Sequence, residues 1–108
     1  MNRERLRDRR LSETFTLELH GLRYVASFSR FDDGRVAEVF LQNHKSTSQS
    51  DSNARDSAIA ASLALQHGCS LETLRRALLR DAQGNASTPL GAALDIIAAS
   101  EEPRGERP

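Results

Sequence analysis

The stretch Gly34-Arg-Val-Ala-Glu-Val-Phe-Leu-Gln42 changes character abruptly at its end. Its alternating β-branched and aromatic residues favour a β-strand. A wholly polar run, Asn43 to Asn53, follows, and an alanine-rich segment then extends to Gly68. Alanine is the strongest helix former, and glycine commonly ends a helix. The sequence therefore predicts a strand, a polar junction and a long helix, in that order.

Two further strands are predicted before this one. Residues Glu13 to Leu19 alternate apolar and polar side chains, as a half-buried strand does, and Arg23 to Phe31 continue the pattern. His20-Gly21 and Asp32-Asp33-Gly34 have turn compositions that favour hairpins between successive strands. Together with Arg35 to Leu41, these segments predict a three-stranded antiparallel meander.

The third predicted strand is apolar on both faces. Ala37, Val39 and Leu41 share one face, and alternation assigns Val36 and Phe40 to the other. A strand with two apolar faces is typical of a buried position or of an interface on its second face. We therefore expect a protein contact on that second face, at Val36, Glu38 and Phe40.

Three helices are predicted after the strands. The first has an apolar stripe that we expect to include Ile59 and Leu63, with Asp51, Ser52 or Asn53 as its N-cap. The second starts at Ser70 and the third at Pro89, a residue favoured in the first helical turn. The predicted core positions of the three helices are Ala54, Ala58, Ala61, Leu65, Leu71, Leu74, Leu78, Leu90, Leu94 and Ile97. Strands followed by helices predict an α+β fold with three helices packed on one sheet face.

Bulk properties narrow the class of protein. The 108 residues suit one domain, which we expect at residues 12–99. The tails at 1–11 and 100–108 have few apolar residues, so we expect them to be disordered. A net charge of zero gives no overall attraction to nucleic acid or membrane, and no run is long enough to span a bilayer. The single cysteine, Cys69, excludes a disulfide within the chain, and we expect a cytoplasmic protein with that thiol buried.

The polar junction is the candidate ligand site. A lysine, several hydroxyl groups and the free N–H groups of a helix start can together hold a phosphate. An ordinary solvated loop with an N-cap is the alternative interpretation. The residues of this predicted phosphate or nucleotide site are Lys45, Ser46, Thr47, Ser48 and Ser50.

No catalytic or metal site emerges from the residues. Glu38 could serve as an acid or base if it were buried, but a structural pairing with Arg23 or Arg35 is the alternative. The histidines at 20, 44 and 67 do not share metal-ligand spacing within one element. The sequence therefore predicts no metal and no cofactor.

Several segments, in this order, resemble a known family. The chain is similar to the TSCPD domain, found at the C-terminal side of adenosylcobalamin-dependent ribonucleotide reductases and as small stand-alone proteins. The segments that carry the resemblance are Gly34 to Leu41, Lys45 with its hydroxyl neighbours, Ser62 to Gly68, Leu74 to Leu79 and Thr88 to Leu94.

The resemblance implies a link to deoxyribonucleotide synthesis without the activity itself. The family's eponymous segment has a cysteine before its proline, where this chain has Ser87-Thr88-Pro89. Ribonucleotide reduction needs a thiyl radical and a redox-active cysteine pair, and one cysteine cannot supply three thiols. The resemblance therefore implies an accessory module that contacts a protein partner, such as a reductase subunit, or forms a homodimer.

Overall fold

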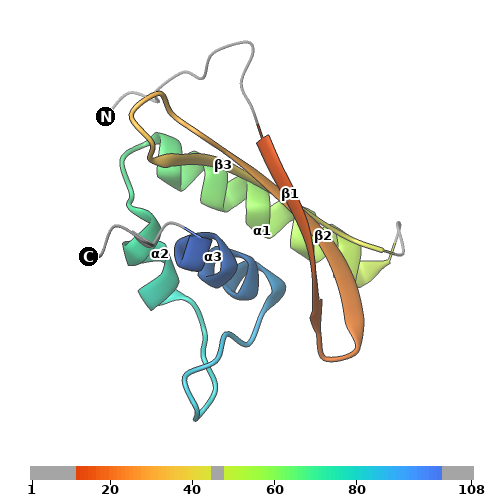
Figure 1. The fold of residues 1–108 in the computed structure, drawn as a ribbon. Coiled ribbons are helices and arrows are strands. Elements are labelled where there is room, and N and C mark those ends of the chain that lie inside the picture. Colours follow the sequence, from red (N-terminus) through yellow and green to blue (C-terminus); the bar gives the residue numbers. More distant parts are fainter. Residues whose placement is uncertain (1–11, 45–47, 101–108) are drawn as a thin grey trace, which may run out of the picture.

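The computed structural model describes residues 12–44 and 48–100, which form one antiparallel sheet followed by helices (Figure 1). The strand order β1-β2-β3 confirms the predicted meander and the α+β class. Helix α1 runs along β3 behind the strands, while α2 and α3 lie together at the left of the view, with α3 between α2 and the strands. The elements are β1 (Ser12–Leu19), β2 (Leu22–Arg30), β3 (Val36–Asn43), α1 (Gln49–Gln66), α2 (Leu71–Ala77) and α3 (Pro89–Ser100).

The turn between β1 and β2 is as tight as the sequence predicts. His20 and Gly21 have φ values of 53° and 81°. Positive φ at both central residues is the type I′ pattern, whose twist matches that of the strands it joins. Leu19 and Leu22 are therefore directly opposed, and the pairing continues without interruption to Ser12 and Ser29.

A β-bulge distorts the start of β3. Ser29 pairs with Glu38, but the next residue, Arg30, pairs with Val36, so Ala37 is the extra residue. The bulge breaks the alternation of faces, and Val36 and Ala37 are both buried, at 5% and 0% exposure. The expectation that Val36 lies on the outer face is therefore wrong, because strict alternation fails at a bulge.

One hydrophobic core lies between the sheet and the helices. Every predicted helix core position in α1 and α3 is buried, while those of α2 are partly buried against the same core. Ile59 and Leu63 are exposed, contrary to the expected stripe. The largest completely buried side chains are Leu94, Ile97 and Val39.

The helix ends follow local capping rules. Ser48 is the N-cap of α1, three residues before the earliest predicted position, and its Oγ accepts a hydrogen bond from the Asp51 N–H at 3.0 Å. Gly68 follows the helix with φ of 103°, a conformation that disfavours other residues. Ser70 caps α2 and Pro89 begins α3, as predicted.

Polar side chains of α1 seal the edge of the sheet at β3. The Ser62 hydroxyl accepts a hydrogen bond from the Val39 N–H at 2.9 Å and donates one to the Val39 carbonyl at 3.0 Å. Gln66 donates to the Ala37 carbonyl at 3.0 Å. Because these side chains are buried, the helix satisfies backbone groups that would otherwise be left open at an edge strand.

The first turn of α1 completes this seal. Asp51 is 4% exposed, and its Oδ1 accepts a hydrogen bond from the Asn43 N–H at 2.9 Å. Its other oxygen, Oδ2, pairs with Arg55 Nε at 2.8 Å. The start of α1 therefore meets the end of β3, and Gln66 at the end of α1 meets the start of β3, so helix and strand are antiparallel.

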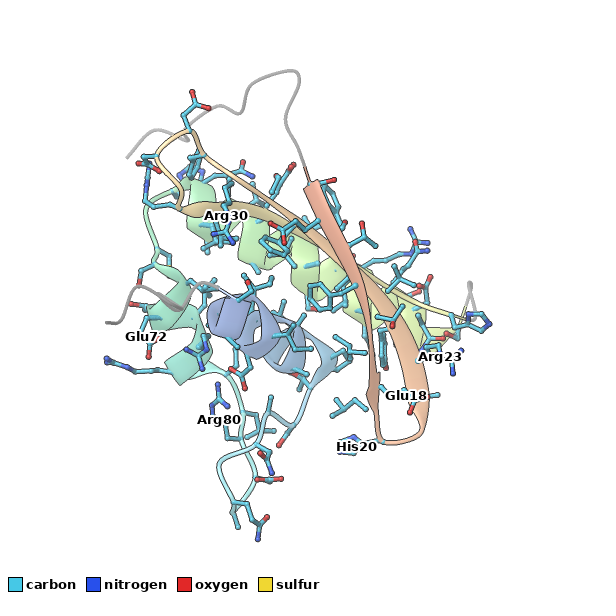
Figure 2. The ribbon with its side chains drawn as sticks, viewed as in Figure 1. Glu18, His20, Arg23, Arg30, Glu72 and Arg80 are labelled. Atoms are coloured by element: carbon cyan, nitrogen blue, oxygen red, sulfur yellow. The ribbon has the colours of Figure 1, made fainter. Side chains whose placement is uncertain are left out.

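One carboxylate connects α2 and α3. Asp95 accepts hydrogen bonds from Arg75 Nε at 2.9 Å and from both terminal nitrogens of Arg80 at 2.8 Å. The hydrogen bonds from Arg80, followed by those from Arg75, hold the pKa of Asp95 below its ordinary value. Arg80 lies below α2, at the start of the connection to α3 (Figure 2).

Candidate functional site

An open groove of about 410 Å³ lies where the outer face of the sheet meets α1. Phe40 and Ile59 are 54% and 57% exposed, and they are the large apolar side chains at this site. The residues lining the groove are Thr14, Val25, Ser27, Phe40, Leu41, Gln42, Arg55, Ala58 and Ile59. We call this set of residues the outer groove.

The strand register brings the groove residues together. Thr14 pairs with Ser27, and Ser27 pairs with Phe40, so these side chains form one row across the outer face. Val25 and Gln42 form the neighbouring row. Because α1 is antiparallel to β3 and bonded to its edge, one side of the helix projects beside these rows.

The groove combines an apolar wall with a polar end. Val25, Phe40 and Ile59 supply the apolar surface. At the polar end, Arg55 Nη2 donates to Gln42 Oε1 at 3.2 Å while its Nε pairs with Asp51. This arrangement fixes a half-exposed guanidinium beside exposed apolar groups, a combination common at binding surfaces.

Leu41 contributes backbone rather than side chain to the groove. Its side chain packs in the core, and its N–H and C=O point to the α1 side of β3, as those of Val39 do. Ala58 lies opposite without a polar side chain, and in the part of the chain that the structure describes no helix side chain bonds to Leu41. A donor and an acceptor therefore border the groove beside its apolar wall.

The predicted contact residues have separate locations. Phe40 lies in the outer groove. Glu38 is half-buried on the same strand, and its Oε1 accepts a hydrogen bond from Ser29 Oγ at 3.3 Å. Val36 belongs to the core. Arg23 and Arg35 pair with Glu18 and Asp33 rather than with Glu38.

The predicted phosphate site is only partly described. Lys45, Ser46 and Thr47 lie outside the described residues. The Ser48 hydroxyl is engaged in the N-cap, while Ser50 occupies the first turn of α1. The buried carboxylate of Asp51 stands in that same turn and opposes an anion there.

Histidine and cysteine do not form a site. Within residues 12–44 and 48–100, no group of His, Cys, Asp and Glu side chains is arranged to hold a metal ion. Cys69 is partly exposed between α1 and α2, so its predicted burial is wrong. Nor is any helix in these two segments both long and apolar enough to cross a bilayer.

Sequence reasoning missed the helix side of the groove. Ile59 stands among small residues in α1. Helical periodicity alone placed it in the apolar stripe that faces the core. Asp51, Ser62 and Gln66 are buried polar residues on one side of the same helix. Their spacing was a signal for a polar contact, but the strand edge that they bind is distant in sequence.

The chain is similar to a segment of much larger reductases. It is 36% identical over 70 residues to a vitamin B12-dependent ribonucleotide reductase from Bradyrhizobium diazoefficiens and to one from Agrobacterium fabrum. The matched region is 65% of this chain and 6% of each relative. No family model and no solved structure matches the chain. These results support a module related to vitamin B12-dependent ribonucleotide reductases.

Proposed function

We propose that this chain is a non-catalytic accessory module of the TSCPD kind that docks on a protein partner through the outer groove. The exposed pair Phe40 and Ile59 carries the proposal. The core is complete without these side chains, so their exposure to water has no structural benefit in the isolated chain. Apolar anchors surrounded by polar groups are typical of docking surfaces.

The similarity to reductases suggests the partner. A segment related to part of a large enzyme is suited to contact that enzyme's other parts, so we propose a vitamin B12-dependent ribonucleotide reductase as the partner. The single cysteine supports a role outside the chemical steps, because one thiol cannot act as both a radical site and a redox pair.

The Phe40→Asp variant tests the docking surface. A carboxylate at this anchor requires desolvation on binding, so capture of the reductase from the native cell should weaken by about tenfold or more. Ile59→Asp should act in the same direction. Leu79→Asp is the matched control, because Leu79 is 68% exposed and does not line the groove. If Phe40→Asp and Ile59→Asp captured the reductase as well as the control Leu79→Asp does, docking at this surface would be refuted.

A small nucleotide is the second candidate for the same groove. The backbone N–H and C=O of Leu41 could bind the donor and acceptor edge of a base, with Phe40 against its ring. Lys45 follows β3 in the sequence, and its charge makes it the candidate residue for the phosphate. Calorimetry with a panel of nucleotides should give heat that Lys45→Ala reduces. Absence of heat at millimolar nucleotide would remove this candidate.

A further inference from the structure

The two edge strands of the sheet differ in whether a helix supplies hydrogen-bond partners to their outward backbone groups. Helix α1 closes the β3 edge at Val39, Ala37 and Asn43 with buried hydrogen bonds from Ser62, Gln66 and Asp51, and leaves the backbone of Leu41 to the outer groove. Strand β1 is the opposite edge. Across the two described segments, the hydrogen-bond partners of β1 all belong to β2, and no side chain of α2 or α3 hydrogen-bonds to it.

The backbone groups that point outward from β1 can be identified from the turn. Leu19 and Leu22 flank a type I′ turn, so they are a hydrogen-bonded pair, and every second residue of β1 before Leu19 bonds to β2. The N–H and C=O groups of Thr14, Thr16 and Glu18 therefore point away from the sheet. The His44 N–H, which donates to Arg23 O at 2.9 Å, fits this alternation on the other side of β2.

We propose that β1 pairs antiparallel with β1 of a second copy of this chain, with Thr16 on the two-fold axis. The two sheets then join into one. In this register, Thr16 lies opposite Thr16, Phe15 opposite Leu17 of the second copy, and Thr14 opposite its Glu18. The outward groups of these residues meet as hydrogen-bonded pairs on both sides of the axis.

Self-complementarity favours a second copy as the occupant. Phe15 and Leu17 meet twice, and an aromatic residue opposite an aliphatic one stabilises paired strands. The Glu18 carboxylate lies opposite a threonine rather than another carboxylate. Moving the axis to Phe15 would instead place Glu13 opposite the buried Leu17. The net charge of zero adds no overall repulsion between copies.

The composition of β1 also suits pairing. Its eight residues, SETFTLEL, contain no proline or lysine, and its pairing with β2 has no bulge. Proline, lysine and β-bulges are three devices with which proteins protect exposed edges from other strands, and β1 has none of the three. Glu13 and Glu18 are its only charged residues, so a regular edge without proline, lysine or a bulge, opposite a covered one, is consistent with a strand reserved for an intermolecular contact.

Thr16→Pro tests the contact without removing a hydrogen bond inside the protomer, because the N–H at this position points outward. Because each copy donates its Thr16 N–H to the other, the substitution removes two hydrogen bonds from the dimer. The dissociation constant in sedimentation equilibrium should therefore rise about ten- to a hundredfold. Thr16→Val, which keeps the N–H, should remain dimeric. Phe40→Asp should also remain dimeric, which separates this contact from docking in the groove.

Two outcomes would overturn the proposal: a wild-type chain that sediments as a monomer at millimolar concentration, or a folded Thr16→Pro variant with unchanged association. Circular dichroism reports whether that variant is folded. If it is not, Thr16→Lys replaces it, because two lysines would face each other on the axis and should separate the copies. A dimer that tolerates Thr16→Lys would equally refute the pairing.

Single cysteines test the register. In a Cys69→Ser background, Thr16→Cys should form a disulfide between copies on oxidation, because hydrogen-bonded pairs bring Cα atoms to about 5.5 Å, within disulfide range. Thr14→Cys alone should not cross-link, whereas Thr14→Cys combined with Glu18→Cys should. Rapid cross-linking through Thr14→Cys alone would show that Thr16 is not on the axis.

Discussion

At Asp95, two guanidinium groups converge on one carboxylate that is 29% exposed. Arg75 belongs to α2, Arg80 to the following connection and Asp95 to α3, so three segments depend on one side chain. Arg80 additionally donates to the carbonyl groups of Gly84 and Arg75. We regard this network as the main polar link between the two short helices, since paired charges with several hydrogen bonds are stronger than isolated surface pairs.

Replacing Asp95 with Asn should destabilise the fold by about 1–3 kcal/mol, because both arginines lose their charged acceptor. Urea unfolding at neutral pH measures this loss. Asp33→Asn is the control, because the Asp33–Arg35 pair is exposed and joins near neighbours, so its loss should be much smaller. An equal effect of both changes would show that the network around Asp95 has no special role.

The lowered pKa of Asp95 also predicts how the stability of the fold changes with pH. A carboxyl group whose pKa is lower in the folded state adds stability that is complete above its unfolded value, about 3.9, and is lost as pH falls through the folded value. The wild-type chain should therefore lose stability below about pH 4 more steeply than Asp95→Asn. Parallel acid-unfolding curves for the two proteins would contradict this assignment.

Among the elements, α1 combines three roles: a core stripe, a seal on the β3 edge and one wall of the outer groove. The core stripe was predictable because it repeats at the helical period. The seal was not, because a serine or glutamine in a helix has the same local pattern whether it faces water or a strand edge. Ile59 was expected in the apolar stripe for the same reason, although its tertiary placement exposes it.

Local chemistry predicted the remaining elements well. The tight turn at His20-Gly21, the N-cap at Ser70 and the helix start at Pro89 all depend on neighbouring residues only. The burial of Val36 depends on a bulge, which strict alternation cannot anticipate. For the candidate site, Phe40 was predictable as an outward apolar residue, but the groove around it needed the position of α1.

The seal itself can be tested with Ser62→Ala. This change leaves the buried N–H and C=O of Val39 without their partner and should cost about 1–3 kcal/mol in urea unfolding. Hydrogen exchange should show faster exchange at the Val39 amide. Ser57→Ala is the matched control, because the Ser57 hydroxyl donates to the Ala54 carbonyl within its own helix rather than to a strand. Unchanged exchange at Val39 would mean that the hydroxyl is dispensable.

On the scale of the whole molecule, one sheet carries both the proposed docking groove and the proposed pairing edge. Phe40 lies on β3, the edge strand that α1 covers, whereas Thr16 lies on β1 at the opposite edge, and Thr14 lines the groove from β1 as well. Pairing through β1 would place two outer grooves on one face of a joined sheet. A partner with two equivalent docking sites would then bind with the advantage of simultaneous engagement.

Opening the sealed edge should change the size of the assembly. The double variant Ser62→Ala with Gln66→Ala exposes the carbonyl groups of Ala37 and Val39 at β3. We expect light scattering to show species larger than a dimer for this variant but not for the wild-type chain. A double variant that stays dimeric on prolonged incubation would show that packing of α1 blocks the edge without these hydrogen bonds.

The difference between the two edges sets a natural limit on growth. A sheet with both margins open can accept a neighbour on each side and lengthen into a fibre. If copies pair through β1 as proposed, α1 closes most of the other margin among the described residues, and the assembly would end at two copies. Ser62 and Gln66 would therefore protect the chain against aggregation as much as they stabilise it.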